Sequence, residues 1–249
     1  MLGACSSGTD GGAVSGSRAT DMRAEVLAVL PHDSAAFTQG LELSGDVLYE
    51  GTGLEGQSSM RAVDPTTAQV TRKIDLPPEM FGEGVTVAGS RIWQITWKNG
   101  IAIQRDKATL AEVRRVSYTG EGWGLCLDGQ RLVMSDGSDK LTFRDPETFE
   151  PVGEVRVHDG ESPVTELNEL ECTPRGVYAN VWQTDRVVRI DPASGQVTAR
   201  IDLAGLLSAQ ERAGADVLNG IAAVPGTEEF LVTGKLWPKM FRVRFVTTQ

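Results

Sequence analysis

The chain has 249 residues and a hydrophobic fraction of 40%, and its 34 acidic residues outnumber its 24 basic ones. A formal charge of -10 disfavours a nucleic-acid partner, because binding a phosphate backbone requires an excess of basic side chains. With two histidines and no cysteine pair at zinc-ligand spacing, the chain fits neither a zinc enzyme nor a Ser-His-Asp hydrolase. We therefore expect no metal and no other cofactor.

The first 23 residues differ from the rest in composition. Leu-Gly-Ala-Cys followed by a Ser/Gly-rich stretch resembles the cleavage end of a bacterial lipoprotein signal, and no apolar run here is long enough to span a bilayer. This pattern predicts a lipidated Cys5, a flexible tether over 6–20, and an exported protein of the periplasm or cell surface. The alternative is a chance string of small residues. We assign 1–23 to this start and tether, and 24–249 to one folded domain.

A strand is predicted over 24–33, and two kinds of hairpin then alternate along the chain. Each is a pair of alternating strands around a polar turn, which is typical of a β-hairpin. The first kind covers 37–53, 81–97, 121–137, 167–182 and 218–235. The second kind covers 60–76, 101–118, 141–157 and 187–203, with turns at Asp64, Asp106, Asp145 and Asp191, and ends in a single strand over 240–246.

Four strands in each unit of about 40–45 residues are the sequence pattern of a β-propeller. There are five units, so the predicted fold is all-β, a five-bladed β-propeller. The fifth unit lacks its outer strand, whereas the strand over 24–33 belongs to no unit. We expect this N-terminal strand to pair into the last blade and close the ring, which leaves no long exposed edge. An irregular β-sandwich with drifting hairpins is the alternative.

The innermost strand of each propeller blade lines the central channel, so equivalent positions of the repeat should meet around the axis. One such set is Gln39, Glu83, Trp123, Asn168 and Asn219. The other end of the same hairpins gives Gly53, Trp97, Gly137, Trp182 and Lys235. A carboxylate, an ammonium group and amides among three tryptophans predict a small-molecule site with aromatic walls and a few convergent polar groups.

Each of these residues also has a purely structural explanation. Inward tryptophans can plug a core, and the three amides can tie strand ends to the backbone. Glu83 and Lys235 can form a structural ion pair, but buried ion pairs are weak sources of stability. Burial of both charges in a site walled by tryptophans therefore favours a functional role.

Nine short motifs occur in the order that is seen in the plant- and bacterial-type glutaminyl cyclases. They are FTQGL, GEG, QITW, EGWGL, SDGS, LNELE, ANVW, DVLNGIA and TGKLWPK, and the resemblance runs from about residue 25 to 245. These proteins are five-bladed propeller glutaminyl-peptide cyclotransferases. The resemblance implies conversion of an N-terminal glutamine of a peptide or protein into pyroglutamate with release of ammonia. It does not extend to the zinc-dependent glutaminyl cyclases of animals.

For this reaction we assign Glu83 as the proton shuttle between the α-amine and the leaving nitrogen, and Lys235 as the group that stabilises the oxyanion. Gln39 or Asn168 assists Lys235. The three tryptophans clamp the glutamine side chain in a curled shape, and Asn168 and Asn219 read the substrate backbone. The substrate-binding set is therefore Gln39, Trp97, Trp123, Asn168, Trp182 and Asn219.

Two further points concern cysteines and competing functions. Cys126 and Cys172 lie in neighbouring predicted blades, where a disulfide is conceivable, but we expect two buried free thiols. We expect a monomer. The competing functions are a non-catalytic propeller that binds a small cationic or peptide ligand, and a metal-dependent propeller hydrolase or lactonase in which Glu83, Asn168 and Asn219 supply part of the ligand set.

Overall fold

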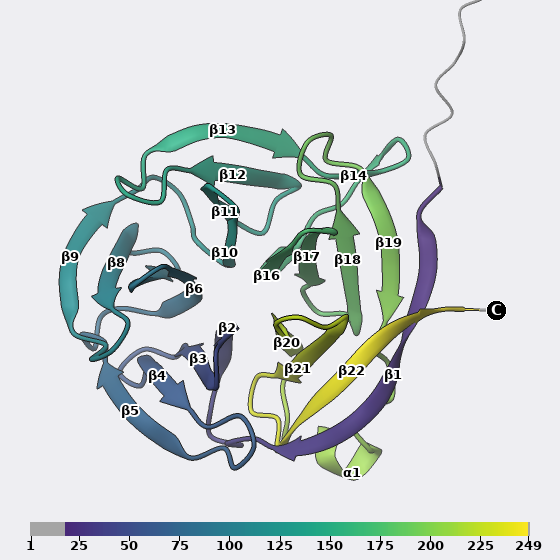
Figure 1. Cartoon of the computed structure of the whole chain (residues 1–249), viewed down its shortest axis with the longest axis horizontal. Coiled ribbons are helices and arrows are strands. Elements are labelled where there is room, and N and C mark those ends of the chain that lie inside the picture. The colour runs from purple at the N-terminus through teal and green to yellow at the C-terminus, as the bar shows by residue number, and fades with distance from the viewer. Residues whose placement is uncertain (1–17, 249) are drawn as a thin grey trace, which may run out of the picture.

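Antiparallel hairpins make up nearly all the regular structure of residues 18–248, the residues described by the structure, which is a computed structural model (Figure 1). Cys5 and most of the predicted tether lie outside the described residues. Three sheets have four strands each, hydrogen-bonded in chain order. Their strands are β2 (Thr38–Ser44), β3 (Val47–Thr52), β4 (Ser59–Val63) and β5 (Val70–Asp75); β6 (Gly82–Ala88), β7 (Arg91–Thr96), β8 (Ile101–Asp106) and β9 (Glu112–Ser117); and β10 (Leu125–Asp128), β11 (Arg131–Ser135), β12 (Lys140–Arg144) and β13 (Pro151–Arg156).

The remaining long strands form one eight-stranded sheet in the order β16-β17-β18-β19-β1-β22-β21-β20. Their bounds are β1 (Thr20–Pro31), β16 (Leu167–Thr173), β17 (Gly176–Val181), β18 (Arg186–Ile190), β19 (Val197–Asp202), β20 (Leu218–Ala223), β21 (Glu229–Gly234) and β22 (Lys239–Thr247). The first strand starts at Thr20, earlier than the predicted residue 24. Its first residues run parallel to β19, and its whole length from Met22 pairs antiparallel with β22. Strand β1, at the start of the described chain, thus pairs with β22, the last strand, and connects it to β19.

The predicted hairpins are confirmed, with two additions and one shift. A small hairpin of β14 (His158–Asp159) and β15 (Ser162–Pro163) and a short helix, α1 (Ala209–Arg212), were not expected. Strand β10 starts only at Leu125, so Trp123 lies in an irregular segment before the strand rather than on it. Among residues 18–248 there is no helix of the length and apolarity needed to cross a bilayer.

The aspartates of the second hairpin kind stabilise their turns through their own side chains. Oδ1 of Asp64 accepts hydrogen bonds from the backbone N–H groups of Thr66 (2.8 Å) and Thr67 (3.0 Å). Oδ1 of Asp106 and of Asp145 accepts the same pair of bonds two and three residues later. Since an Asp side chain closes such a turn locally, the repeated aspartate is explained by backbone geometry and not by chemistry at a site.

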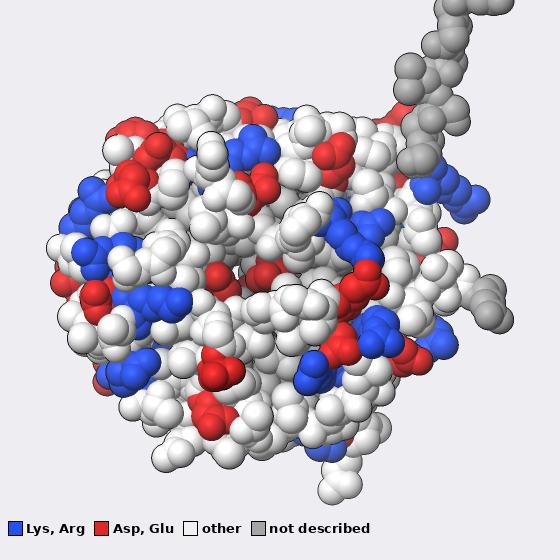
Figure 2. All heavy atoms as spheres, in the orientation of Figure 1, with Lys and Arg blue, Asp and Glu red and all other residues white. Residues whose placement is uncertain are grey.

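The innermost strands β2, β6, β10, β16 and β20 lie side by side around the centre of the molecule (Figure 1). Glycines make this close approach possible. A Cβ added at Gly40 would lie 2.4 Å from N of Val85, and one at Gly84 would lie 2.6 Å from N of Leu125. A space-filling view shows that the surface is hollowed near this centre, with acidic side chains visible there (Figure 2).

On β16, the fourth of these innermost strands, the position equivalent to Gly40 and Gly84 is occupied by a glutamate, Glu169. Glu169 is fully buried, and its Oε1 accepts from N of Leu41 (3.1 Å) while its Oε2 accepts from N of Ile221 (2.8 Å). Burial raises the pKa of this carboxyl well above its ordinary value, and the two backbone donors act in the opposite direction. One side chain on β16 therefore ties together two inner strands, β2 and β20, at the centre.

Cys126 and Cys172 form a disulfide, so the expectation of two free thiols is wrong. The residues lie on the adjacent inner strands β10 and β16, and their Cα atoms are 5.4 Å apart, within the range that a disulfide requires. The repeat indicated neighbouring blades but did not show that the two side chains point toward each other. The bond therefore joins the sheet of β10 covalently to the sheet of β16.

We expect the Cys126→Ala/Cys172→Ala double variant to unfold more easily by about 2–4 kcal/mol, because the bond closes a long loop in the unfolded chain. Urea unfolding of both proteins measures the difference. In a Cys5→Ser variant, which leaves Cys126 and Cys172 as the only cysteines of the chain, the unreduced, denatured protein should not react with a thiol reagent, and after reduction both cysteines should react. Reaction of either cysteine without reductant would contradict the assignment.

Candidate active site

A cavity of about 460 Å³ opens where the inner strands begin and the second strands end. Both ends of every first-kind hairpin reach this side of the molecule, because the two strands are antiparallel. The lining residues are Phe37, Gln39, Phe81, Glu83, Trp97, Trp123, Asn168, Trp182, Gln183, Asp216, Val217 and Lys235. All the predicted site residues except Asn219 therefore surround one cavity.

A chain of amide hydrogen bonds leads to the carboxylate. Nδ2 of Asn219 donates to the carbonyl oxygen of Thr38 (3.0 Å) and to Oε1 of Gln39 (3.3 Å). Nε2 of Gln39 in turn donates to Oε1 of Glu83 (3.1 Å). Asn219 is fully buried behind Gln39 and does not line the cavity, so it orients Gln39 rather than meeting a ligand.

Glu83 is a buried carboxyl group with half of its hydrogen-bonding capacity unused. Its exposed fraction is 5%, and within residues 18–248 its Oε2 has no hydrogen-bond partner. Desolvation raises its pKa well above the ordinary value; the charge of Lys235 opposes this, and the charge of Glu121 adds to it. A carboxyl whose pKa is raised in this way is suited to take up and release a proton near neutral pH.

Lys235 supplies the positive charge of the cavity. It follows β21, is 5% exposed, and its Nζ lies 5.0 Å from the centroid of the Phe37 ring. Burial lowers its pKa, whereas the charges of Glu83 and Asp216 raise it. The ammonium group thus sits in a partly desolvated position, where its interaction with a developing negative charge is stronger than in water.

Three half-buried tryptophans form the walls. The centroids of Trp123 and Trp182 are 5.6 Å apart and their planes are nearly perpendicular, while Trp97 packs edge-on against Phe81 at 5.5 Å. Gly137 lies directly beneath Trp123, because a Cβ there would come within 2.7 Å of Cζ2 of the indole. The glycine on this side of the hairpin therefore makes room for the indole rather than for a ligand.

Asn168 adds a free acceptor to the cavity. Its side chain is buried, and within the described residues its Oδ1 has no partner. Its backbone oxygen accepts from Oγ of Ser135 (2.6 Å) and lies close above Gly124, where a Cβ would be 2.1 Å from that oxygen. The position of Asn168 is thus fixed through its backbone, and its side-chain oxygen is left for a hydrogen-bond donor.

Several residues of the cavity and of its immediate surroundings were missed in the sequence. Phe37 and Phe81 precede Gln39 and Glu83 by two positions, and Glu121 occupies the same position before Trp123. Because these three residues occupy equivalent positions of the repeat, the sequence could have predicted that they lie close to the cavity. Gln183 and Asp216 lie on connecting segments, where no periodic pattern marks them.

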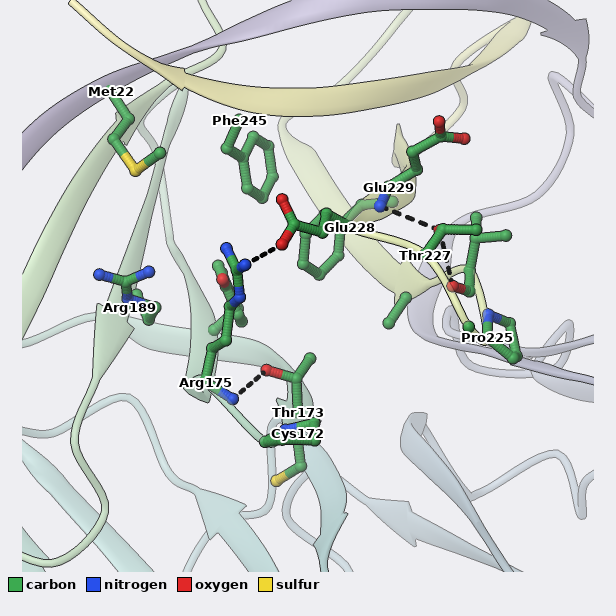
Figure 3. A pocket seen from close by; sticks show the side chains of 16 residues that line it. Met22, Cys172, Thr173, Arg175, Arg189, Pro225, Thr227, Glu228, Glu229 and Phe245 are labelled. Carbon is green, nitrogen blue, oxygen red and sulfur yellow. Dashed lines mark hydrogen bonds and ion pairs between the residues drawn. The ribbon is translucent and has the colours of Figure 1, made fainter.

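A second cavity, of about 320 Å³, lies between the ends of strands β16 to β18 and β20 to β22 (Figure 3). Its floor is aromatic, with Phe230 and Phe245 stacked at 4.7 Å. Its carboxylates are already paired: Glu228 with Arg175, and Glu229 with Arg242 and Arg244. It therefore lacks the free acid-base groups of the tryptophan-walled cavity.

Across residues 18–248 no three His, Cys, Asp or Glu side chains are grouped in a way that could bind a metal ion. Of the three residues that a metal-dependent hydrolase would use here, Asn219 points away from the cavity to Gln39 and Thr38. The ionisable side chains that line the cavity are Glu83, Lys235 and Asp216.

Comparison with known proteins gives matches over nearly the whole chain. A curated relative, the glutaminyl-peptide cyclotransferase of Arabidopsis thaliana, is 41% identical over 226 residues, which cover 88% of this chain and 70% of that protein. The crystal structure of glutaminyl cyclase from Myxococcus xanthus has a TM-score of 0.84 and 37% identity and covers 93% of this chain and 100% of the other. A β-propeller domain from Myceliophteria thermophila shares only the fold, with a TM-score of 0.50 and 10% identity over 90% of this chain and 100% of the domain.

The family assignment rests on a match that includes every residue of the cavity. The sequence model described as glutamine cyclotransferase matches residues 1–245. Together with the two glutaminyl cyclases of Arabidopsis and Myxococcus, this match shows that the chain belongs to the glutamine cyclotransferase family.

Proposed function

We propose that this chain is a glutaminyl-peptide cyclotransferase, which converts the N-terminal glutamine of peptides and proteins into pyroglutamate and releases ammonia. The observation that carries the proposal is the buried Glu83, whose Oε2 has no hydrogen-bond partner in the described structure and which lines the same cavity as Lys235. The family match and the two similar glutaminyl cyclases support the same activity.

Ring closure begins with the α-amine of the substrate. Its pKa of about 7.7–8.0 leaves much of it protonated at neutral pH, so a base must remove a proton before the nitrogen can attack. Oε2 of Glu83 is the base that this structure offers, since Oε1 is already bonded to Gln39. The neutral nitrogen then forms a bond to the γ-amide carbon, and the five-membered ring closes.

The second half of the reaction breaks the bond between that carbon and the amide nitrogen. The carbonyl oxygen carries negative charge in the tetrahedral intermediate, and Lys235 stabilises it from its desolvated position. Glu83 returns the proton that it accepted to the departing nitrogen, which leaves as ammonia, and its carboxylate then takes the surplus proton of the ring nitrogen, so that a neutral lactam remains. This last proton passes to the released ammonia or to solvent, so a substrate with a protonated α-amine gives pyroglutamate and ammonium.

The aromatic walls supply orientation. The glutamine side chain must curl until its amide carbon meets its own α-amine, and a chain held in that geometry reacts far faster than a free one. Trp97, Trp123 and Trp182 enclose the space in which this curled shape fits, and Oδ1 of Asn168 accepts one of its N–H groups. Asn219 does not contact the substrate, and its hydrogen bond to Gln39 holds that side chain in place.

We further propose that the fold is a five-bladed β-propeller closed by β1, and that the protein is an exported monomer tethered through a lipidated Cys5. The adjacent innermost strands, the pairing of β1 with β22 and the likeness to a known propeller domain support the fold. The Cys126–Cys172 disulfide supports export, because such bonds persist in oxidising compartments. Loss of membrane association in a Cys5→Ser variant, measured by cell fractionation, tests the tether.

The function is tested by incubating the protein with a short peptide that begins with glutamine. Mass spectrometry should show loss of one ammonia, and a peptide that begins with another residue should stay unchanged. Glu83→Gln should lower kcat by about 10²–10⁴-fold, because the amide can neither accept nor return the proton. Turnover close to that of the wild type would remove Glu83 from the role of base.

The same variant should be more stable than the wild type at neutral pH. The pKa of Glu83 is raised in the folded state, so its contribution to stability is present at low pH and is lost as pH rises through the folded pKa. Glutamine removes the cost of burying the ionised form and keeps a bond to Gln39. Thermal unfolding should show a Tm raised by a few degrees, and a Glu55→Gln variant, which changes an exposed carboxylate, should show no shift.

We expect Lys235→Met to lower kcat by about 10²–10³-fold with a smaller change in KM, because the ammonium group acts mainly on charge that develops during the reaction. It should also move the acid limb of the kcat/KM profile to higher pH, since the charge of Lys235 lowers the pKa of Glu83. Steady-state kinetics over a pH series measures both effects. A raised KM with unchanged kcat would make Lys235 a binding residue only.

A further inference from the structure

One carboxylate oxygen holds two walls of the cavity. Oε2 of Glu121 accepts from Nε1 of Trp97 (2.7 Å) and from Nε1 of Trp123 (3.0 Å). The two indoles come from different sheets, since Trp97 follows β7 and Trp123 precedes β10. Their relative orientation is therefore not fixed by any single sheet. The backbone N–H of Gly122 donates to the carbonyl oxygen of Trp97 (3.0 Å), and Glu121 is the side chain that links the two indole N–H groups.

The remaining contacts of the indoles limit their movement from other directions. Nζ of Lys98 lies 3.9 Å from the centroid of Trp97 and 3.8 Å from Oε1 of Glu121. Trp123 lies over Gly137 and against the edge of Trp182. Each indole ring is thus held by packing, and each indole N–H is held by the same oxygen of Glu121. Loss of that oxygen would leave both N–H groups without a partner and would let both rings rotate.

Glu121 does not itself line the substrate cavity. Its side chain is 39% exposed and lines an adjoining polar groove of about 380 Å³ that also contains Asp136, Lys140 and Thr142. The tryptophans stand between this carboxylate and the cavity. Any effect of Glu121 on a bound glutamine must therefore pass through the indoles or through its charge.

We propose that Glu121 is a positioning residue for the cyclisation: its carboxylate sets the angle between Trp97 and Trp123, and this angle holds the substrate in its curled, reactive shape. The kinetic part of this inference rests on the proposed function. The anchoring of the indoles does not, because it is a property of the free protein.

Glu121 also acts on the proton shuttle through its charge. The charged or titratable groups that face Glu83 are Lys235 after β21, Glu121 before β10 and Tyr118 after β9. The negative charge of Glu121 adds to the rise in the pKa of Glu83. Removal of that charge should therefore lower this pKa and move the acid limb of kcat/KM toward lower pH.

Two variants separate the hydrogen bonds from the charge. Glu121→Gln removes the charge but keeps an oxygen that can accept from both indoles, whereas Glu121→Ala removes both. Glu55→Gln, an exposed carboxylate in the loop after β3, is the matched control. Kinetics with a glutamine-starting peptide should be measured at a pH above the acid limb, where the charge effect on Glu83 no longer changes the rate.

There we expect Glu121→Ala to lower kcat/KM by about 10- to 100-fold, mainly in kcat, because misplaced walls admit unreactive shapes of the substrate. Glu121→Gln should stay within about threefold of the wild type, as should Glu55→Gln. Both Glu121 variants should share the shift of the acid limb. An alanine variant that matches the control, or a glutamine variant that falls as far as alanine, would overturn the positioning role.

A measurement without substrate keeps the inference separate from the proposed function. The near-ultraviolet circular dichroism of the folded protein should lose tryptophan signal in Glu121→Ala and retain it in Glu121→Gln, with unchanged far-ultraviolet spectra. If the wild type failed to cyclise any glutamine peptide, the proposed function would be wrong while this readout still decided the anchoring. An unchanged alanine spectrum would show that Glu121 does not hold the indoles.

Discussion

The close approach of the innermost strands at the centre is the constraint on which the rest of this molecule depends. Gly40 and Gly84 permit it where a side chain would collide with the next backbone, and Glu169 bridges the ring with two hydrogen bonds to backbone amides. Each of these residues directly follows a cavity residue in the chain: Gln39, Glu83 and Asn168. The contacts between the inner strands therefore also set the distances between the side chains of the cavity. In this way five similar hairpins bring different polar side chains together at one place.

The same arrangement explains how an acid is kept reactive inside the protein. Glu83 is nearly as buried as the core, yet its neighbours on the cavity side are an amide, aromatic rings and a lysine whose own pKa is lowered by burial. A close, fully bonded ion pair would have stabilised the ionised forms and removed their reactivity. Here one carboxylate oxygen is fixed by Gln39 and the other is left without a partner. The cost in stability is borne at the site where, in the mechanism proposed above, the proton moves.

The repeat made the hairpins and most of the cavity predictable, because residues at equivalent positions of similar units must face the same centre. It could not show which way a side chain turns from that position. Asn219 occupies the same register as Glu83 but turns toward Gln39, and Cys126 turns toward Cys172. Glu121 was visible in its motif, but its contact depends on how two sheets are set against each other. Such an angle is a property of packing, which alternation of polar and apolar residues does not encode.

Strand β1 has a polarity that matters for anything attached before it. Its last residue, Pro31, pairs with Lys239, close in the chain to Lys235 of the cavity, whereas Met22 pairs with Thr247 at the other end of β22. The chain thus enters β1 at the end remote from the cavity and travels toward it. An anchor joined upstream would hold the molecule from behind, and the opening would face the medium from which peptide ends arrive.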